Sequence, residues 1–443
     1  MKPVPLQVGS ASAGTDTAGA ASRKAARRLL PFLMLCYFCA YLDRVNVSFA
    51  ALTMNRDLGL SASAYGFGAG LFFLGYVAFE IPSNLILERV GARLWIARIM
   101  VTWSLISGAT AFVTGETTFS LARLALGLAE AGFFPGIIFY LTLWFPAEQR
   151  GRIIGTFMVA VPLSAAVGGP VSGLILTATD GALGLAGWQW LYLIEAAPSL
   201  VLGVLTLTVL TDRPADAAWL TPAERTALAA RLAADARPDA AEPREHLRAS
   251  RLSALRQPRL LGLALVYFGL STGLYAVGLW LPQIVAGFGL APLATGLVSA
   301  LPYCAAAAVM VPWTRRSDAT GERAWHTGGP AILAGIALVA ASQAPGPLVS
   351  ILALSAASMG VFAALPTFWT LPTTLLDARA AAGGIALVNA VGGLGGFVGP
   401  ALMGWIRDAT GRFDHALAAV GLLLVATGLF AARLGRGLRK PAA

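Results

Sequence analysis

Charged residues are scarce in this chain. Asp, Glu, Lys and Arg make up only 12% of its 443 residues, whereas hydrophobic residues make up 57%. Soluble domains carry about 25% charged residues and bury their apolar side chains in a core of limited size. The composition therefore excludes an ordinary soluble protein and predicts one that lies in a membrane.

Cysteine and histidine are also rare. The three cysteines lie in apolar stretches and the three histidines lie in or beside expected loops, namely Cys36, Cys39, Cys304, His246, His326 and His415. This distribution excludes a disulfide framework and a Cys/His metal site, and it leaves carboxyl groups as the only candidates for carrying protons. No set of nucleophile and base stands out either, so we expect neither an enzyme nor a cofactor.

Long apolar segments dominate the rest of the chain. A helix needs about 20 apolar residues to cross about 30 Å of hydrocarbon. Twelve such segments can be marked, at residues 29–51, 64–87, 94–114, 118–143, 152–177, 189–210, 258–287, 292–313, 325–342, 347–374, 382–405 and 416–433. We therefore predict an all-α membrane protein with twelve transmembrane helices.

Most Lys and Arg residues lie in alternate loops. They are concentrated in the N-terminal tail 1–28, the polar central loop 211–257, the other even-numbered loops and the C-terminal tail 434–443. By the positive-inside rule these parts are predicted to be cytoplasmic, including both termini. The net charge of +10 is thus a signal of topology in a lipid bilayer and not of a nucleic-acid partner. Within the central loop, Thr221-Pro222-Ala223-Glu224 predicts the start of a short amphipathic helix.

An internal repeat divides the chain into two six-helix halves, residues 29–210 and 258–433. Two motifs recur at an offset of 230 residues: Glu88, Gly91 and Arg93 match Asp318, Gly321 and Arg323, and Gly169-Pro170 matches Gly399-Pro400. Two pseudo-symmetric six-helix bundles, related by an axis along the membrane normal, are typical of major facilitator transporters, which hold substrate near the midplane.

The acid, glycine and arginine motif has a mechanical interpretation. The acid stands at a helix end, the glycine permits a turn, and the arginine can clasp a neighbouring helix end. Such an ion pair can form in one conformation and break in another, so we predict that both copies take part in gating. A static topological anchor is the alternative.

Charged residues away from the helix ends occur only in the first half. Asp43 and Arg44 are neighbours in the first helix, and Arg123 and Glu130 lie seven residues apart on one face of the fourth. A charge near the middle of a bilayer costs roughly 2.5–3.5 kcal/mol, which favours a functional role. Arginine suits carboxylate capture, so Arg44 and Arg123 are predicted to bind an anion, and Asp43 and Glu130 to carry protons. The alternative is a static buried salt-bridge cluster.

Other polar or aromatic residues in the spans supply further candidates. Tyr41, Tyr76, Trp369 and Asn389 are predicted to contact the substrate, with packing as the alternative for the aromatic residues. The remaining buried charges of the first half are expected to be structural, namely Glu80, Arg98 and Glu195.

Several longer stretches are similar to those of a known family. They are Tyr41–Ala50, Phe79–Asn84, Glu130–Gly136, Trp188–Trp190, Leu210–Pro214 and Gly383–Asn389. Together they resemble the anion:cation symporter family of the major facilitator superfamily over nearly the whole chain. Within that family the chain looks closest to bacterial permeases for tartrate, phthalate and 4-hydroxyphenylacetate.

The resemblance implies proton-coupled uptake of a small organic carboxylate by alternating access, by a monomer in the bacterial cytoplasmic (inner) membrane. It also implies that Asp43 and Glu130 carry protons and that Arg44 and Arg123 engage the substrate or its charge network. One departure is that the fifth helix has no Asn or Gln where sugar-acid carriers place an amide, which favours a less hydroxylated or aromatic acid.

Two other functions stay open at this point. One is antiport or export of an anion or drug by the same fold. The other is a transporter-like carboxylate sensor, although the central loop is short for an output domain.

Overall fold

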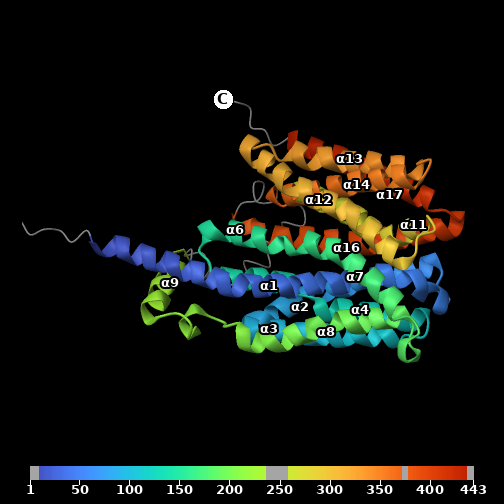
Figure 1. Ribbon diagram of the computed structural model, residues 1–443. Coiled ribbons are helices and arrows are strands. Elements are labelled where there is room, and N and C mark those ends of the chain that lie inside the picture. The colour runs from blue at the N-terminus through green and yellow to red at the C-terminus, as the bar shows by residue number, and fades with distance from the viewer. Residues whose placement is uncertain (1–8, 236–257, 372–377, 437–443) are drawn as a thin grey trace, which may run out of the picture.

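The computed structural model describes residues 9–235, 258–371 and 378–436, and all regular elements within these ranges are helical. Twelve described helical segments are long and apolar enough to cross a membrane. They lie roughly alongside one another in a bundle (Figure 1). The predicted all-α fold with twelve spans is confirmed.

The first half contains eight helices, because its fourth and fifth spans are each divided in two. They are α1 (Gly9–Asp57), α2 (Ala62–Val90), α3 (Ala92–Ala109), α4 (Glu116–Glu130), α5 (Phe133–Thr142), α6 (Ala147–Met158), α7 (Ala160–Ala178) and α8 (Gly187–Val209). Short 3-10 turns lie in the connections, namely η1 (Thr110–Phe112), η2 (Ala182–Gly184) and η3 (Pro214–Asp216).

The described part of the second half contains six helices. They are α11 (Pro258–Ala286), α12 (Pro292–Thr320), α13 (Ala324–Ser342), α14 (Pro347–Phe368), α16 (Ala378–Thr410) and α17 (Phe413–Arg436). Between the halves lies α9 (Pro222–Asp235), which begins at the proline of the motif that predicts it. In Figure 1 the first half, blue to green, and the second half, yellow to red, form two adjacent bundles.

The halves pack together mainly along two pairs of helices, α2 with α16 and α7 with α12, and α1 also contacts α11. The backbones of α7 and α12 approach so closely that a methyl group on Gly169 would lie 2.6 Å from the carbonyl oxygen of Gly296. A methyl group on Gly296 would meet the carbonyl oxygen of Gly169 in the same way. Glycine at these two positions therefore permits close contact between the halves.

The fourth span is broken directly after Glu130. Ala131 turns out of the helix with a ψ of 131°, and Gly132 has a φ of 86°, a conformation that favours glycine. Pro135 supplies a reason for the break, because in a continuous helix its ring would clash with the carbonyl of residue 131. The break makes Glu130 the last residue of α4.

The first helix starts earlier than the sequence predicts. A tail is expected up to residue 28, but α1 begins at Gly9 and packs on α9. Lys24 forms an ion pair of 3.2 Å with Glu224, and the Arg28 guanidinium lies 5.4 Å from the ring centre of Trp219. Several alanines of this segment are buried, which the sequence pattern alone did not indicate.

Four predicted segments extend beyond the described residues. These are the start of the N-terminal tail, at 1–8, part of the central loop, at 236–257, the end of the predicted tenth span, at 372–374, and most of the C-terminal tail, at 437–443.

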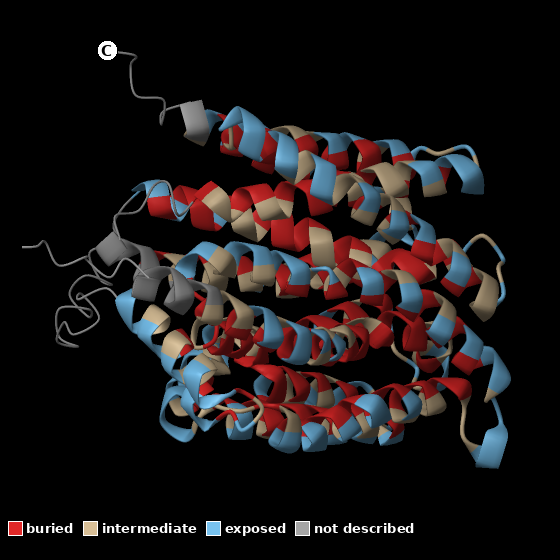
Figure 2. Cartoon of the chain, turned by 60° about the vertical axis from the view of Figure 1, so that its left-hand side comes forward, coloured by how far each residue is buried: buried red, intermediate tan, exposed pale blue. Residues whose placement is uncertain are grey.

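Large apolar side chains are exposed along the outer faces of the bundle. Examples are Leu105 and Leu265, each 57% exposed. Figure 2 shows exposed positions along the outer helices and buried positions inside. Such a surface is unfavourable in water and matches the hydrocarbon of a bilayer, as expected for a multi-pass membrane protein.

Candidate functional site

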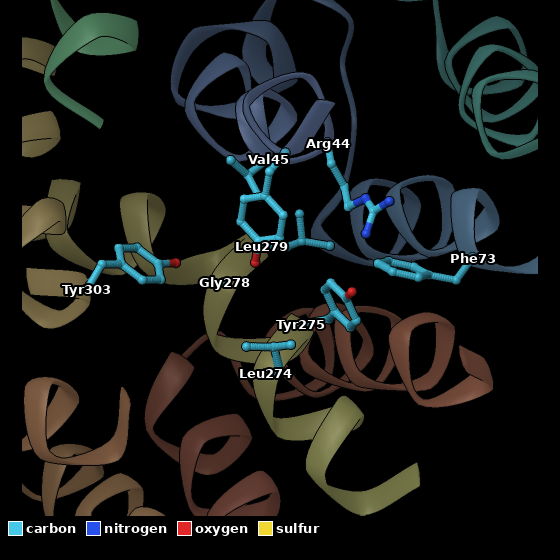
Figure 3. A pocket seen from close by; sticks show the side chains of 9 residues that line it. Arg44, Val45, Phe73, Leu274, Tyr275, Gly278, Leu279 and Tyr303 are labelled. Atoms are coloured by element: carbon cyan, nitrogen blue, oxygen red, sulfur yellow. The ribbon is translucent and has the colours of Figure 1, made fainter. Parts of the chain in front are cut away.

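A pocket lies between the two halves. Its walls come from α1, α2, α11 and α12, through Tyr41, Arg44, Val45, Phe73, Leu274, Tyr275, Gly278, Leu279 and Tyr303. The side chains of Arg44, Phe73 and Tyr275 converge there from three helices (Figure 3). The pocket therefore combines one cation with mostly aromatic and aliphatic walls.

A second pocket adjoins the first on the side of the second half. The two share Leu274, Gly278 and Tyr303. The rest of its lining comes from α11 and α14, namely Gly273, Val277, Ala357, Ser358, Val361 and Phe362. Apart from the hydroxyls of Ser358 and Tyr303, these side chains are apolar.

Arg44 forms an ion pair with Glu130. Glu130 is 1% exposed, and the guanidinium carbon of Arg44 lies 5.3 to 6.0 Å from the ring centres of Phe72, Tyr76 and Tyr41. The ion pair is thus enclosed by aromatic rings, where Coulomb attraction is stronger than in water.

Arg123 is close to this cluster but does not line the pocket. Its guanidinium carbon lies 5.2 Å from the ring centre of Phe72, which also faces Arg44. The side chain is 1% exposed, and none of its three nitrogens has a hydrogen-bond partner in the described part of the chain. Arg123 and Glu130 share one face of α4, as predicted, yet Glu130 pairs with Arg44.

Asp43 lies away from the pocket, inside the first half. Its carboxylate accepts hydrogen bonds from Trp103 Nε1 at 3.0 Å, Ser107 Oγ at 3.3 Å and Ser199 Oγ at 2.6 Å. Consecutive helical residues point about 100° apart, which explains why Asp43 and Arg44 face different compartments. The structure therefore separates the two residues that the sequence places side by side.

The remaining predicted contact residues fall into two groups. Tyr41 lines the pocket, and Tyr76 faces Arg44. Asn389 of α16 instead donates a hydrogen bond of 2.7 Å to Glu80 of α2, across the two halves. Trp369 packs edge-on against Tyr267, with ring centres 4.8 Å apart.

The two copies of the acid, glycine and arginine motif differ. In the second copy Arg323 pairs with Asp318 at 2.6 Å, so the ends of α12 and α13 are joined within the motif. In the first copy Arg93 faces Asp212, which follows α8: the Arg93 backbone N–H donates to it at 2.8 Å, and the side chains lie 3.7 Å apart.

The other members of the motifs take different positions. Glu88 is exposed and has no ion pair among the described residues. Gly91 and Gly321 both have a positive φ, of 97° and 65°, which is the turn expected of glycine in the motif.

Only Tyr41 and Arg44 of the pocket lining were predicted, and the two tyrosines of the second half, Tyr275 and Tyr303, were not. They lie 230 residues after Val45 and Phe73, which line the same pocket from the first half. The offset of the internal repeat therefore relates the two walls of the pocket. Neither Val45 nor Phe73 is among the predicted site residues, so the offset applied to those predictions does not identify the two tyrosines. The first-half residues that line the pocket had to be known first.

Two six-helix bundles around a pocket with a buried ion pair define a membrane transporter of the major facilitator type. The Major Facilitator Superfamily model matches residues 33–400, and the chain belongs to this family. It is a secondary transporter and not an enzyme, as the sequence predicts.

Curated relatives agree with this family. The chain is 50% identical to a candidate tartrate transporter of Agrobacterium vitis over 94% of each chain. It is 46% identical to the candidate metabolite transport protein NicT of Pseudomonas putida, over 88% of this chain and 89% of the relative. A quinolone resistance transporter of Acinetobacter baumannii is 38% identical over 90% and 91%.

Solved structures show the same fold at low identity. The inward-open xylose transporter XylE from E. coli matches with a TM-score of 0.73 at 16% identity, over 92% of this chain and 95% of that one.

Proposed function

We propose that this protein is a proton-coupled symporter that takes up a small organic carboxylate. The observation that carries the proposal is the ion pair of Arg44 and Glu130 beside the pocket between the halves. Arginine binds carboxylates through charge-assisted hydrogen bonds, and here its present partner is itself a carboxylate that can take up a proton.

Competition for Arg44 provides the coupling. When Glu130 is ionised it occupies the guanidinium, and a substrate carboxylate has to displace it. A proton on Glu130 removes that negative charge and leaves Arg44 to the substrate. Proton and anion then bind together, and the pocket gains no net charge when both are present. Because net charge is costly in a low-dielectric interior, the loaded carrier can rearrange more readily than one holding the anion alone.

The pocket walls favour one carboxylate attached to an apolar or aromatic body. Arg44 is the cation that lines the pocket, and the adjoining space beside Val361 and Phe362 is mostly apolar. An aromatic acid would place its carboxylate at Arg44 and its ring toward Tyr275 and Tyr303. The names of the relatives in Agrobacterium vitis support a hydroxylated dicarboxylate such as tartrate instead.

Uptake into proteoliposomes tests both parts of the proposal. A pH gradient, acidic outside, should drive accumulation of the true substrate from a panel of tartrate, phthalate, hydroxyphenylacetate and nicotinate. Collapse of the gradient with a protonophore should abolish accumulation but not exchange of labelled for unlabelled substrate. Accumulation that ignores the gradient would contradict proton symport.

An exporter is the second candidate, because one relative is named a quinolone resistance transporter and quinolones are themselves aromatic acids. The same vesicles with the gradient reversed separate the two functions. An antiporter would expel substrate toward the acidic side, whereas a symporter would carry it away from that side.

We also propose the orientation and the gating contacts. Basic residues are concentrated in the loops on the same side as the two termini, which supports cytoplasmic termini in a bacterial inner membrane. A single chain forms the whole pocket, which supports a functional monomer. The pairs of Arg93 with Asp212 and of Arg323 with Asp318 are the proposed gating contacts on the side of the termini.

A further inference from the structure

A second carboxyl group lies inside the first half, near Asp43. Glu195 of α8 is 2% exposed. Ser172 of α7 donates a hydrogen bond of 2.8 Å to its Oε1, whereas Oε2 has no hydrogen-bond partner in the described part of the chain. An ionised carboxylate with one neutral donor is costly in such a place, because burial removes water from the charge without replacing it.

Glu195 has no cationic partner among the described residues. The titratable groups that interact electrostatically with Glu195 are Asp43 and Cys39 of α1 and Tyr192 of α8. The other packed helices, α3 and α7, contribute uncharged donors, and no ion pair involves Asp43 or Glu195 among the described residues. The charged groups beyond these residues are Glu130, which interacts electrostatically with Asp43, and Arg123, which interacts electrostatically with Tyr192.

Asn46 adds an independent observation. This α1 residue is fully buried and faces Glu195, yet neither its amide nitrogen nor its amide oxygen has a partner in the described structure. An amide can donate to a carboxylate or accept from a carboxylic acid. Asn46 therefore suits a carboxyl group that changes between its two protonation states.

We propose that Glu195 is a further proton-binding residue, which shares a compartment inside the first half with Asp43, the acid that the sequence already predicts to carry a proton. This compartment is separate from the ion pair of Arg44 and Glu130 at the pocket. A proton adds to a carboxylate oxygen of the pair and leaves from the same atom. Two carboxyl groups in one dry compartment disfavour double ionisation, so they bind protons as a unit. The inference rests on the proposed proton coupling and adds a second place where a proton is held.

The competing interpretation is that Glu195 merely ties α8 to α7 through Ser172. Glu195→Gln distinguishes the two, because glutamine keeps an acceptor for Ser172 and nearly the same shape but cannot bind a proton. Ser172→Ala does the reverse, since it removes the tie and keeps the acid. Glu116→Gln, at the exposed first turn of α4, is the matched control for loss of one acid.

The decisive measurement is infrared difference spectroscopy of the purified carrier, without substrate, between buffers of about pH 6 and about pH 9, in both of which ordinary exposed carboxyl groups are ionised. Protonated carboxyl groups absorb apart from carboxylates, so the change in that band follows the protons bound. In Glu195→Gln and in Asp43→Asn, we expect the change in the band of protonated carboxyl groups to be smaller than in the parent by about one carboxyl group, or its midpoint pH to shift. Ser172→Ala should leave the band amplitude intact.

Measurements of uptake by the same variants distinguish failure of this proposal from failure of the proposed symport. We expect Glu195→Gln to shift the pH profile of uptake while substrate exchange persists. A band change and a pH profile equal to those of Glu116→Gln would overturn the inference. If the parent showed no gradient-driven uptake but Glu195→Gln still reduced the band, the proton site would stand and the symport proposal would fail.

Discussion

In the proposed mechanism, Glu130 and the substrate compete for Arg44. Arg44 lines the pocket, and its guanidinium pairs with a carboxylate that is almost fully buried. The neighbouring aromatic rings offer the cation weak attraction but no hydrogen-bond acceptors that could replace a carboxylate. Removal of either ionic partner should therefore change the strength and the pH dependence of substrate binding in opposite ways.

Glu130→Gln removes the competitor for Arg44 while keeping the size of the side chain. In the parent, binding should weaken by about tenfold per pH unit once Glu130 is ionised, because each bound substrate then requires one proton. In the variant binding should be nearly independent of pH, and accumulation against a gradient should be lost. Binding titrations across pH check this, and a slope equal to that of the parent would remove Glu130 from the coupling role.

Arg44→Gln should act in the opposite direction. The substrate loses its charge-assisted hydrogen bonds, and Glu130 is left buried without a cation, so affinity should fall by about tenfold or more at every pH. Arg98→Gln is a suitable control, since Arg98 lies in a first-half helix away from the pocket and packs on Trp95. Unchanged affinity in Arg44→Gln would contradict a substrate carboxylate at this position.

For Arg123 we expect a substitution to lower transport without lowering the stability of the fold. The buried Arg123 guanidinium has no hydrogen-bond partner in the described structure, and such a charge is costly to keep. Arg123→Met should therefore melt at or above the temperature of the parent, while transport falls by about tenfold or more, because the charge beside Phe72 is lost. Thermal denaturation and uptake check the two halves of this prediction. Lower stability together with normal uptake would mean that Arg123 serves the fold.

At the scale of helices, an acid of the second half caps a helix of the first. Asp408 of α16 accepts hydrogen bonds from the backbone N–H groups of Ala62 at 3.1 Å and Ser63 at 2.7 Å, in the first turn of α2. Nearby, Tyr65 donates to the carbonyl of Leu279 at 3.0 Å. Both contacts lie at the end of the bundle opposite the termini, where they hold the halves together.

Asp408→Ala should loosen this contact. Loss of a helix cap costs about 1 kcal/mol, which corresponds to a roughly fivefold shift between closed and open forms. Gln283 lies beside Asn55 across the same interface, so Gln283→Cys in a Cys304→Ala background reports opening through its rate of labelling. Asp414→Ala is the control, because Asp414 lies at the same end but pairs within the second half. Equal labelling rates in the two variants would contradict the role of Asp408.

The sequence predicts helices better than it predicts the directions of their side chains. The number of spans follows from the thickness of hydrocarbon. The break after Glu130 was not predicted, because residues 118–143 are marked as one span, although Gly132 and Pro135 explain it once it is seen. The compartment of Asp43 does not follow from α1 alone, because it depends on Trp103 and Ser199 being brought together by other helices. Likewise, the unexpected start of α1 depends on its packing against α9.

At the scale of the whole molecule, alternating access requires the contacts between the halves to break and reform. The close approach of α7 and α12 is one such contact, and it depends on the absence of side chains at Gly169 and Gly296. It lies on the same side as the Asp408 cap, since α7 ends and α12 begins at the end opposite the termini. The halves are therefore in contact at that end. The proposed uptake requires these contacts to break when the substrate enters and to form again afterwards.

Gly169→Ala tests whether closure of the contact between α7 and α12 is part of transport. The added methyl group would lie 2.6 Å from the Gly296 carbonyl, and overpacking of this kind typically costs about 1–3 kcal/mol. Relative to the open form, the closed form should become roughly 5- to 150-fold less favoured. The cysteine of Gln283→Cys should therefore be labelled faster, and uptake should slow. Gly151→Ala is the matched control, because it makes the same change in α6, where nothing lies within 4 Å. If Gly169→Ala matched Gly151→Ala in both labelling and uptake, the approach of α7 to α12 would be incidental, and the moving contact between the halves would have to be sought along α2 and α16.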